Sequence, residues 1–323
     1  MQKVEISHRT IIFALFFIAG MLAVYQLRGV LLLFFVAFIL MTALNPLVER
    51  LEKAKIGRTS AIVLVYILVL GLLGFTIASI IPPMIEQTSN LAANFSLPIE
   101  KSEFFKIDLG NINNQIESLS RNVVSVLKIV SSAASNVLGV FTVLVLAFYL
   151  LLERKNFSKY YQVLFGDGEK RKRIERLMEG VEYNLGGWVR GQLALMVIVG
   201  LMSYVGLRIL GIPAALTLAL IAGLLEFIPN LGPTLASLPA IIIGFTISTP
   251  MALGVLFLYI IIQQLENNII VPQVMKRAVG LNPLITLMAL MAGFSLGGIG
   301  GAVLAVPIFL VARVAVFDLY TRR

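Results

Sequence analysis

One stretch without a charged residue occupies residues 61–81 and reads AIVLVYILVLGLLGFTIASII. A helix needs roughly 20 such residues to cross about 30 Å of hydrocarbon, so this run is long enough for one crossing. Residues 11–25, 30–44 and 137–152 form similar runs. Of 323 residues, 59% are hydrophobic and 13% charged, whereas soluble domains carry roughly 25% charged residues. The sequence therefore predicts an all-α integral membrane protein with about eight membrane segments.

The composition excludes several kinds of site. The chain has no cysteine, and its single histidine, His8, lies beside Arg9 in the N-terminal tail. We therefore expect no disulfide, no metal and no cofactor. No Gly-x-x-x-x-Gly-Lys-Ser/Thr motif is present, which argues against ATP binding. Because the apolar body contains no cysteine or histidine to act as nucleophile or base, we expect no enzyme activity.

The basic residues indicate how the chain is oriented in the membrane. The net charge is +9, and the basic residues collect in loops beside the apolar runs, which favours contact with anionic lipid over binding of nucleic acid. Such clusters in residues 45–60 and 153–190 place both segments in the cytoplasm, together with the N- and C-termini. Residues 82–133, which lie one apolar run away from each cluster, are then external.

These assignments divide the chain into consecutive segments. We predict N-terminal membrane helices that form a scaffold at 1–81, an external helical cap at 82–133, a fourth membrane helix at 134–155, a cytoplasmic amphipathic basic segment at 156–188, and two transport repeats at 189–250 and 251–323. We expect the basic segment to lie along the membrane surface before the chain turns into the bilayer.

The predicted cap contains an apolar stripe with heptad-like spacing. Its members are Ile112, Ile116, Leu119, Val123, Val126 and Val130. Such a stripe forms a helix that packs either against a partner within the same chain or against another subunit. The second alternative predicts a homo-oligomer, and the spacing leaves both open.

The C-terminal half contains an internal repeat. Pro213 precedes Gly223 by the same interval as Pro283 precedes Gly293, and each copy reads as helix, break and helix. The hairpins cover residues 213–249 and 283–317. Their predicted tips contain Pro229, Gly232 and Pro233 in the first copy, and Gly297, Gly298, Gly300 and Gly301 in the second. The topology makes the repeats inverted, an arrangement typical of secondary transporters. Full crossings by all four arms remain the alternative.

Two acidic residues are isolated within this apolar body. Between residues 189 and 317 the only acids are Glu226 and Glu266, one in each repeat. An ionisable group at membrane depth costs several kcal/mol unless it is paired or wet, so both are candidate sites for a solute or ion. Asn230 lies near the first acid. Near the second lie Gln263, Asn267 and Asn268, for which helix–helix contact is the alternative role.

A third polar group is formed by Arg190 and Gln192 at the start of the first repeat. Arg190 either neutralises one of the two acids or extends to lipid headgroups.

Several motifs resemble the autoinducer-2 exporter family of bacterial and archaeal membrane proteins. They are Asn-Pro-Leu-Val-Glu at 45–49, Gly-Trp-Val-Arg-Gly-Gln at 187–192, Glu-Phe-Ile-Pro-Asn-Leu-Gly-Pro at 226–233, Gln-Gln-Leu-Glu-Asn-Asn at 263–268 with Pro272, and Gly-Leu-Asn-Pro at 280–283. The resemblance covers nearly the whole chain and implies an eight-spanning transporter of the plasma membrane. It also implies autoinducer-2, a small furanosyl or linear polyol, as substrate, while some similar proteins resemble sodium–proton antiporters.

Three hypotheses about function follow. The first is a secondary transporter that exports a small polar solute, with autoinducer-2 the leading candidate, by alternating access. The second is a sodium–proton antiporter in which Glu226 or Glu266 exchanges a proton for the ion. The third is a passive channel. A proton or sodium gradient would drive the first two, because no site for ATP is present.

Overall fold

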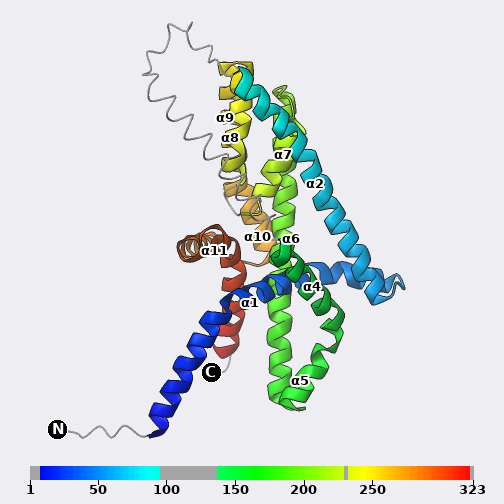
Figure 1. Ribbon diagram of the computed structural model, residues 1–323, viewed down its shortest axis with the longest axis vertical. Helices are drawn as coiled ribbons and strands as arrows, with labels where there is room; N and C mark the ends of the chain where they lie inside the picture. The colour runs from blue at the N-terminus through cyan, green and yellow to red at the C-terminus, as the bar shows by residue number, and fades with distance from the viewer. Residues whose placement is uncertain (1–7, 95–136, 229–231, 321–323) are drawn as a thin grey trace, which may run out of the picture.

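The computed structural model describes residues 8–94, 137–228 and 232–320, and all regular elements in these ranges are helices (Figure 1). Six of the described helical segments are long and apolar enough to cross a membrane. The predicted all-α membrane fold is therefore confirmed. The apolar stripe of residues 112–130, most of the predicted cap, Pro229 and Asn230 lie outside the described residues.

The elements follow one another without a strand in the described ranges. They are α1 (His8–Lys53), α2 (Arg58–Asn94), α4 (Val137–Glu153), the short 3₁₀ helix η2 (Arg154–Asn156), α5 (Phe157–Phe165), α6 (Glu169–Ile209), α7 (Ala215–Leu225), α8 (Gly232–Ile247), α9 (Thr249–Leu265), the π-helical segment η3 (Glu266–Ile270), α10 (Val271–Ala278) and α11 (Pro283–Tyr320).

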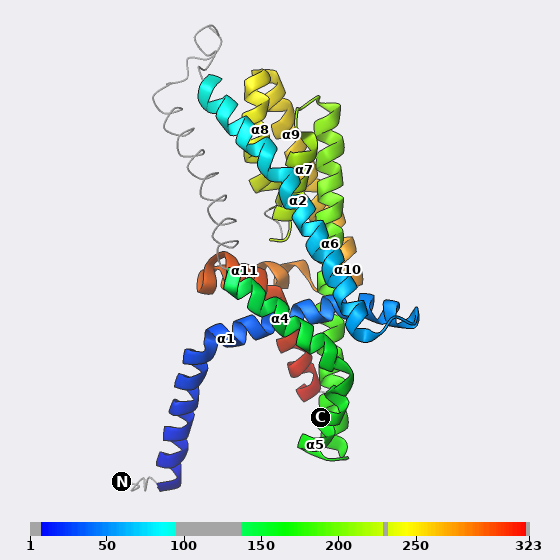
Figure 2. The same ribbon diagram turned by 45° about the vertical axis from the view of Figure 1, so that its right-hand side comes forward.

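Helix α6 is the central element (Figures 1 and 2). Two clusters of buried apolar side chains form along it. Its lower half, which includes Leu185, packs with α1, α2, α4, α10 and α11, where Met41 and Leu310 are fully buried. Its upper half, which includes Val199, packs with α7, α8 and α9. The same helix therefore connects the N-terminal helices to the hairpin of the first repeat.

Two boundaries differ from the sequence prediction. The apolar runs at 11–25 and 30–44, expected as separate helices, form the single helix α1 of 46 residues. Residues 26–29 contain only one glycine and no proline, so nothing in the chain stops the helix between the runs. Helix α6 is likewise continuous from Glu169 to Ile209. The sequence predicted that the chain turns near residue 188, and this prediction is wrong because α6 continues through that point. Gly186, Gly187 and Trp188 lie in the middle of the helix and are buried against its neighbours.

The first predicted hairpin is formed by α7 and α8. Helix α7 runs down from the upper end of α6, and α8 runs back up toward that end (Figure 2). A Cβ placed on Gly223 of α7 would lie 2.8 Å from the carbonyl oxygen of Met196 on α6, so glycine permits this close crossing. With 11 and 16 residues, the two arms are about 16 and 24 Å long, shorter than the hydrocarbon core of about 30 Å.

The second predicted hairpin lies within α11. Its backbone leaves helical geometry at Gly297 and Gly298, and Gly298 has a φ of +59°. The first arm leads sideways from α10, and the second runs beside the lower half of α6 (Figure 1), where Arg173 and Asp318 form an ion pair. Helix α9 runs antiparallel to α6, so the helices that open the two repeats point in opposite directions.

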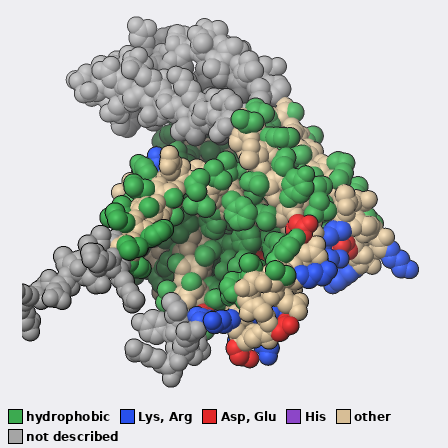
Figure 3. All heavy atoms as spheres, turned by 60° about the horizontal axis from the view of Figure 1, so that its bottom comes forward, with side chains coloured by type: hydrophobic (Ala, Val, Ile, Leu, Met, Phe, Trp, Pro, Cys, Tyr) green, Lys and Arg blue, Asp and Glu red, His purple; other side chains and the backbone are tan. Residues whose placement is uncertain are grey.

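The outer surface matches a lipid environment. Large apolar side chains are exposed along the described helices, among them Phe16, Leu72 and Leu201. Figure 3 shows one face on which hydrophobic side chains predominate, while charged side chains gather toward its lower and right-hand parts. Apolar surface of this extent is covered by lipid tails or by other protein in a membrane.

Candidate functional site

Glu226 and Glu266 are the two acids that the fold encloses. Both are fully buried, with 0% of their surface exposed. Glu226 ends α7 at the descending tip of the first hairpin, and Glu266 begins η3 directly after α9. Their carboxyl groups lie close enough to interact electrostatically. The structure therefore brings together two acids that are 40 positions apart in the sequence.

Glu226 is held by neighbours from α6 and α8. The Nε2 of Gln192, which is 1% exposed, donates a hydrogen bond to the backbone oxygen of Glu226. Gly232, the first residue of α8, lies directly against the acid, because a Cβ on Gly232 would be 2.7 Å from the Cα of Glu226. The start of α8 thus packs against Glu226 at the end of α7.

Glu266 lies where the regular helix changes. Residues Glu266–Ile270 form a π-helical turn between α9 and α10. A π turn widens the helix by one residue, and such turns occur frequently at functional sites. The wider turn changes which side chains face inward, and among the polar residues of this stretch only Glu266 is buried.

The amides around Glu266 make contacts of their own. Nε2 of Gln263 donates to Oδ1 of Asn267 at 3.2 Å, and Oε1 of Gln263 accepts from Thr234 of α8 at 2.8 Å. Asn268 bonds back to Gln264. Asn267 and Asn268 are exposed, so these amides link α9 and η3 to each other and to α8 and do not surround the acid.

The carboxyl oxygens of both acids have no hydrogen-bond partner among the described residues. A buried carboxylate without a partner costs several kcal/mol, so each group requires a proton, a cation or a hydrogen-bonding solute. No cluster of three or more metal-ligating side chains occurs in the described part of the chain. The pair is therefore suited to a proton, a monovalent ion or a polar solute.

A small cavity of about 30 Å³ adjoins Glu226. Its other walls are apolar apart from Thr286. They come from α6, α10, the loop that follows α10 and both arms of α11: Trp188, Leu195, Val271, Met275, Leu281, Thr286 and Val306. This volume matches about one or two water molecules. In this conformation the space at Glu226 accommodates a water or a bare ion, but no larger solute.

Comparisons with known proteins place the chain in a family. The family model described as AI-2E family transporter matches residues 11–321. The chain belongs to the AI-2E transporter family. It is 31% identical over 300 residues to YueF of Bacillus subtilis (strain 168), a match that covers 86% of this chain and 81% of YueF. It is 25% identical over 299 residues to TqsA of Escherichia coli (strain K12), which is named an AI-2 transport protein; the match covers 87% of this chain and 84% of TqsA.

The resemblance stated from the motifs is confirmed by this family match. Membership in a transporter family, together with six helices of membrane-spanning length, identifies a multi-pass membrane protein.

The hairpin tips of this AI-2E family member differ in their surroundings. In the first hairpin, Gly232 and Pro233 are buried. In the second, Gly297, Gly298 and Gly300 are exposed, with nothing within 4 Å of an added Cβ. Gly301 instead packs directly against Gly293 of the opposite arm. Only the first predicted tip therefore contributes to the site at Glu226.

Arg190 does not join the two acids. It forms no ion pair with either of them in the described residues, and it lines a separate cavity with Glu182. The prediction that Arg190 neutralises one of the acids has no support in this conformation.

Two further buried polar residues, on α6 and α9, were not predicted. Ser203 of α6 is fully buried and Tyr259 of α9 is 3% exposed. Tyr259 of α9 precedes Glu266, the first residue of η3, by seven residues or about two helical turns, and this spacing was the available signal.

Proposed function

We propose that this AI-2E family member is a secondary transporter that exports a small polar solute, and that Glu226 and Glu266 couple the movement to a proton. The buried acid pair at the meeting of the two repeats carries this proposal. Because neither carboxyl has a hydrogen-bond partner among the described residues, protonation and deprotonation change the charge of the site without breaking an ion pair that the structure shows. Such a change can bias one bundle of helices between two positions.

The moving part, in this proposal, is the unit of α7, α8, α9 and the first arm of α11. The scaffold is the packed group of α1, α2, α4 and the lower half of α6. The cavity at Glu226 is too small for a solute, so the repeats must separate before a solute reaches the acids. Alternating access provides this separation on one side of the membrane at a time.

Orientation and substrate follow from two further arguments. The proposed location is a bacterial or archaeal plasma membrane, and the basic residues of η2 and the start of α6 support a cytoplasmic position for that end. Autoinducer-2 is the leading candidate substrate, because TqsA is named an AI-2 transport protein.

A sodium–proton antiporter is the second candidate. The cavity of about 30 Å³ next to Glu226 favours it, since this space accommodates an ion as it stands. In that mechanism a carboxyl releases a proton when sodium arrives and regains it after sodium leaves.

Reconstituted vesicles distinguish these functions. Vesicles that contain a pH-sensitive dye and unlabelled autoinducer-2 are prepared with wild type, Glu226→Gln, Glu266→Gln or the exposed control Glu169→Gln. Uptake of labelled autoinducer-2 is measured together with the internal pH. We expect saturable counterflow in wild type and Glu169→Gln, with proton movement lost in the two acid variants. Sodium-dependent proton movement without solute counterflow would establish the antiporter. Linear, non-saturating solute flux would establish a channel.

A further inference from the structure

A second cavity, which is lined mainly by polar residues and has a volume of about 250 Å³, lies beside the lower half of α6. Three elements line it, α1, η2 and α6, with the residues Thr42, Asn45, Pro46, Arg154, Glu179, Glu182, Tyr183 and Arg190. Its volume is close to the lower end of the roughly 300–1,000 Å³ typical of small-molecule sites. It is about eight times larger than the cavity at Glu226, on the ratio of 250 to 30 Å³.

One oxygen of the cavity-lining residue Glu182 has no hydrogen-bond partner among the described residues. Arg154 Nε donates to Oε2 of Glu182 at 2.7 Å. Oε1 of the same carboxylate is buried and has no hydrogen-bond partner among the described residues. A charged acceptor in this position gains from a hydroxyl or amine hydrogen supplied by a ligand.

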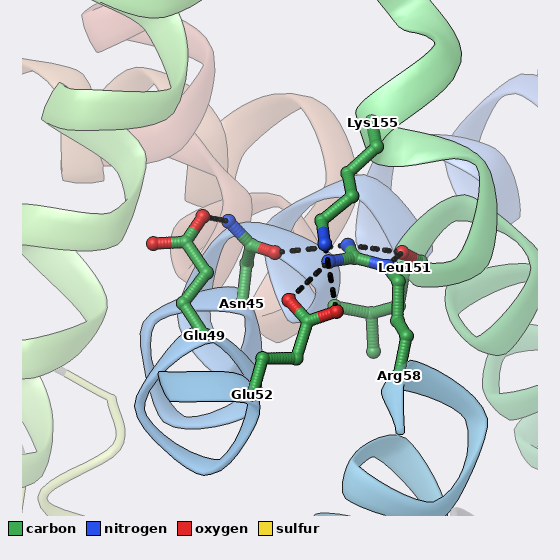
Figure 4. Close-up of polar contacts among 6 residues, drawn as sticks. All are labelled: Asn45, Glu49, Glu52, Arg58, Leu151 and Lys155. Atoms are coloured by element: carbon green, nitrogen blue, oxygen red, sulfur yellow. Dashed lines mark hydrogen bonds and ion pairs between the residues drawn. The ribbon is translucent and has the colours of Figure 1, made fainter. Parts of the chain in front are cut away.

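Asn45 in the opposite wall is fixed by a network behind it (Figure 4). Its Nδ2 donates to Oε1 of Glu49 at 2.7 Å, and its Oδ1 accepts from Nη2 of Arg58 at 3.3 Å. Arg58 is itself held by Glu52 and by the carbonyl oxygen of Leu151. The amide of Asn45 is therefore preorganised, which lowers the entropy lost when a ligand binds.

The charges of the cavity select against ions. Arg154 and Arg190 line the cavity together with Glu179 and Glu182, and Glu49 lies near enough to interact with Glu182. A phosphate or other anion is repelled by these carboxylates, and an anion without an O–H or N–H group has no hydrogen to donate to Oε1 of Glu182. A cation is attracted by the carboxylates but repelled by the two guanidinium groups, so a lining with two charges of each sign offers it little net gain. A hydroxyl both donates to a carboxylate and accepts from a guanidinium.

We propose that this cavity binds a neutral, hydroxyl-rich small molecule, and that it is the site where the transported solute first docks. The second part rests on the proposed function. Arg190 lines this cavity and Gln192, two residues later, contacts Glu226. The stretch of α6 from Glu182 to Gln192 spans about 15 Å, so a docked solute lies close to the acids without touching them.

Equilibrium binding tests the site without requiring transport. The full chain is placed in phosphatidylcholine nanodiscs and titrated calorimetrically with ribitol as a linear five-carbon polyol. We expect saturable binding that Glu182→Gln weakens by about tenfold or more. Glu175→Gln, on the same helix but outside the cavity, changes the affinity by no more than about twofold. If Glu182→Gln does not fold, Glu179→Gln is used in its place. It changes an exposed residue in the wall of the cavity, and we expect it to weaken ribitol binding by a smaller factor.

Other outcomes overturn the inference. Absence of ribitol binding, or equal binding by folded wild type and Glu182→Gln, contradicts the site. If Glu226→Gln loses ribitol binding and Glu182→Gln retains it, the polyol binds at the acid pair and not in this cavity. Binding of inorganic phosphate in place of ribitol, or a signal that requires phosphatidylethanolamine, identifies an anion or a lipid headgroup. Failure of the vesicle transport assay alongside Glu182-dependent binding refutes the proposed function and leaves this site standing.

Discussion

Gly232 lies directly against Glu226: a Cβ on Gly232 would be 2.7 Å from the Cα of Glu226 and 2.8 Å from its backbone nitrogen, and it would also meet the carboxyl group. The start of α8 is therefore fitted to the buried acid at the end of α7. This contact explains why a glycine stands at the break of the first hairpin and what a change there would disturb.

Replacement of Gly232 by alanine should displace Glu226. The added methyl group cannot be accommodated without moving the backbone of one arm, and overpacking of this kind costs about 1–3 kcal/mol. We expect a lower thermal unfolding midpoint of the purified protein in detergent and loss of solute counterflow. Gly300→Ala is the matched control at the second tip, because nothing lies within 4 Å of its added Cβ. Equal effects of the two substitutions would contradict the contact.

Replacement of Gln192 by leucine should uncouple α6 from Glu226. The substitution removes the only side-chain hydrogen bond described for the backbone oxygen of Glu226 and leaves that oxygen buried. An unsatisfied buried acceptor costs about 1–3 kcal/mol. Thermal unfolding measures the loss, with exposed Gln264→Leu as the control, for which we expect a change within about 0.5 kcal/mol. Full stability in Gln192→Leu would show that this hydrogen bond has no role.

Replacement of Arg58 by alanine should loosen the scaffold. Arg58 joins Glu52 of α1 to the carbonyl oxygen of Leu151 at the end of α4, and its side chain is 13% exposed. Removal of one partner from a mostly buried ion pair costs about 3 kcal/mol. Lys155 bonds to the same Glu52 but is 63% exposed, so Lys155→Ala should cost less than about 1 kcal/mol. A comparable loss in both variants, measured by thermal unfolding, would contradict this assignment.

Replacement of Gly293 by alanine should open the second hairpin. The added Cβ would be 2.7 Å from the Cβ of Ala305 and would also meet the carbonyl oxygen of Gly301. The two arms of α11 then separate at a cost of about 1–3 kcal/mol. Gly74→Ala in α2 adds the same group in open space and should be neutral or slightly stabilising. Limited proteolysis measures the opening, and we expect faster cleavage at the tip in Gly293→Ala. Unchanged cleavage in this variant would contradict the prediction.

The sequence predicted part of the candidate site. Glu226 and Glu266 were identified because an isolated acid in an apolar stretch is conspicuous and costly. The roles of their neighbours were not predictable in the same way. Asn267 and Asn268 follow Glu266 directly, yet the π turn at Glu266–Ile270 leaves both exposed and only the acid buried. Arg190 was expected near the acids, but it lines the cavity that contains Glu182.

The sequence by itself determined that this protein is helical, that it lies in a membrane and that its C-terminal half breaks at prolines and glycines. These properties are local, since they depend on the transfer of each segment into hydrocarbon and on backbone freedom at single residues. Only the tertiary structure decided that α6 is one continuous helix, that the two acids are buried close enough to interact and that the cavity lined by Glu182 is separate from the one at Glu226. Each of these depends on contacts between segments far apart in the chain, such as Gly223 on Met196 and Gln192 on Glu226. Such contacts are fixed by the packing of whole helices against one another, which no single segment encodes.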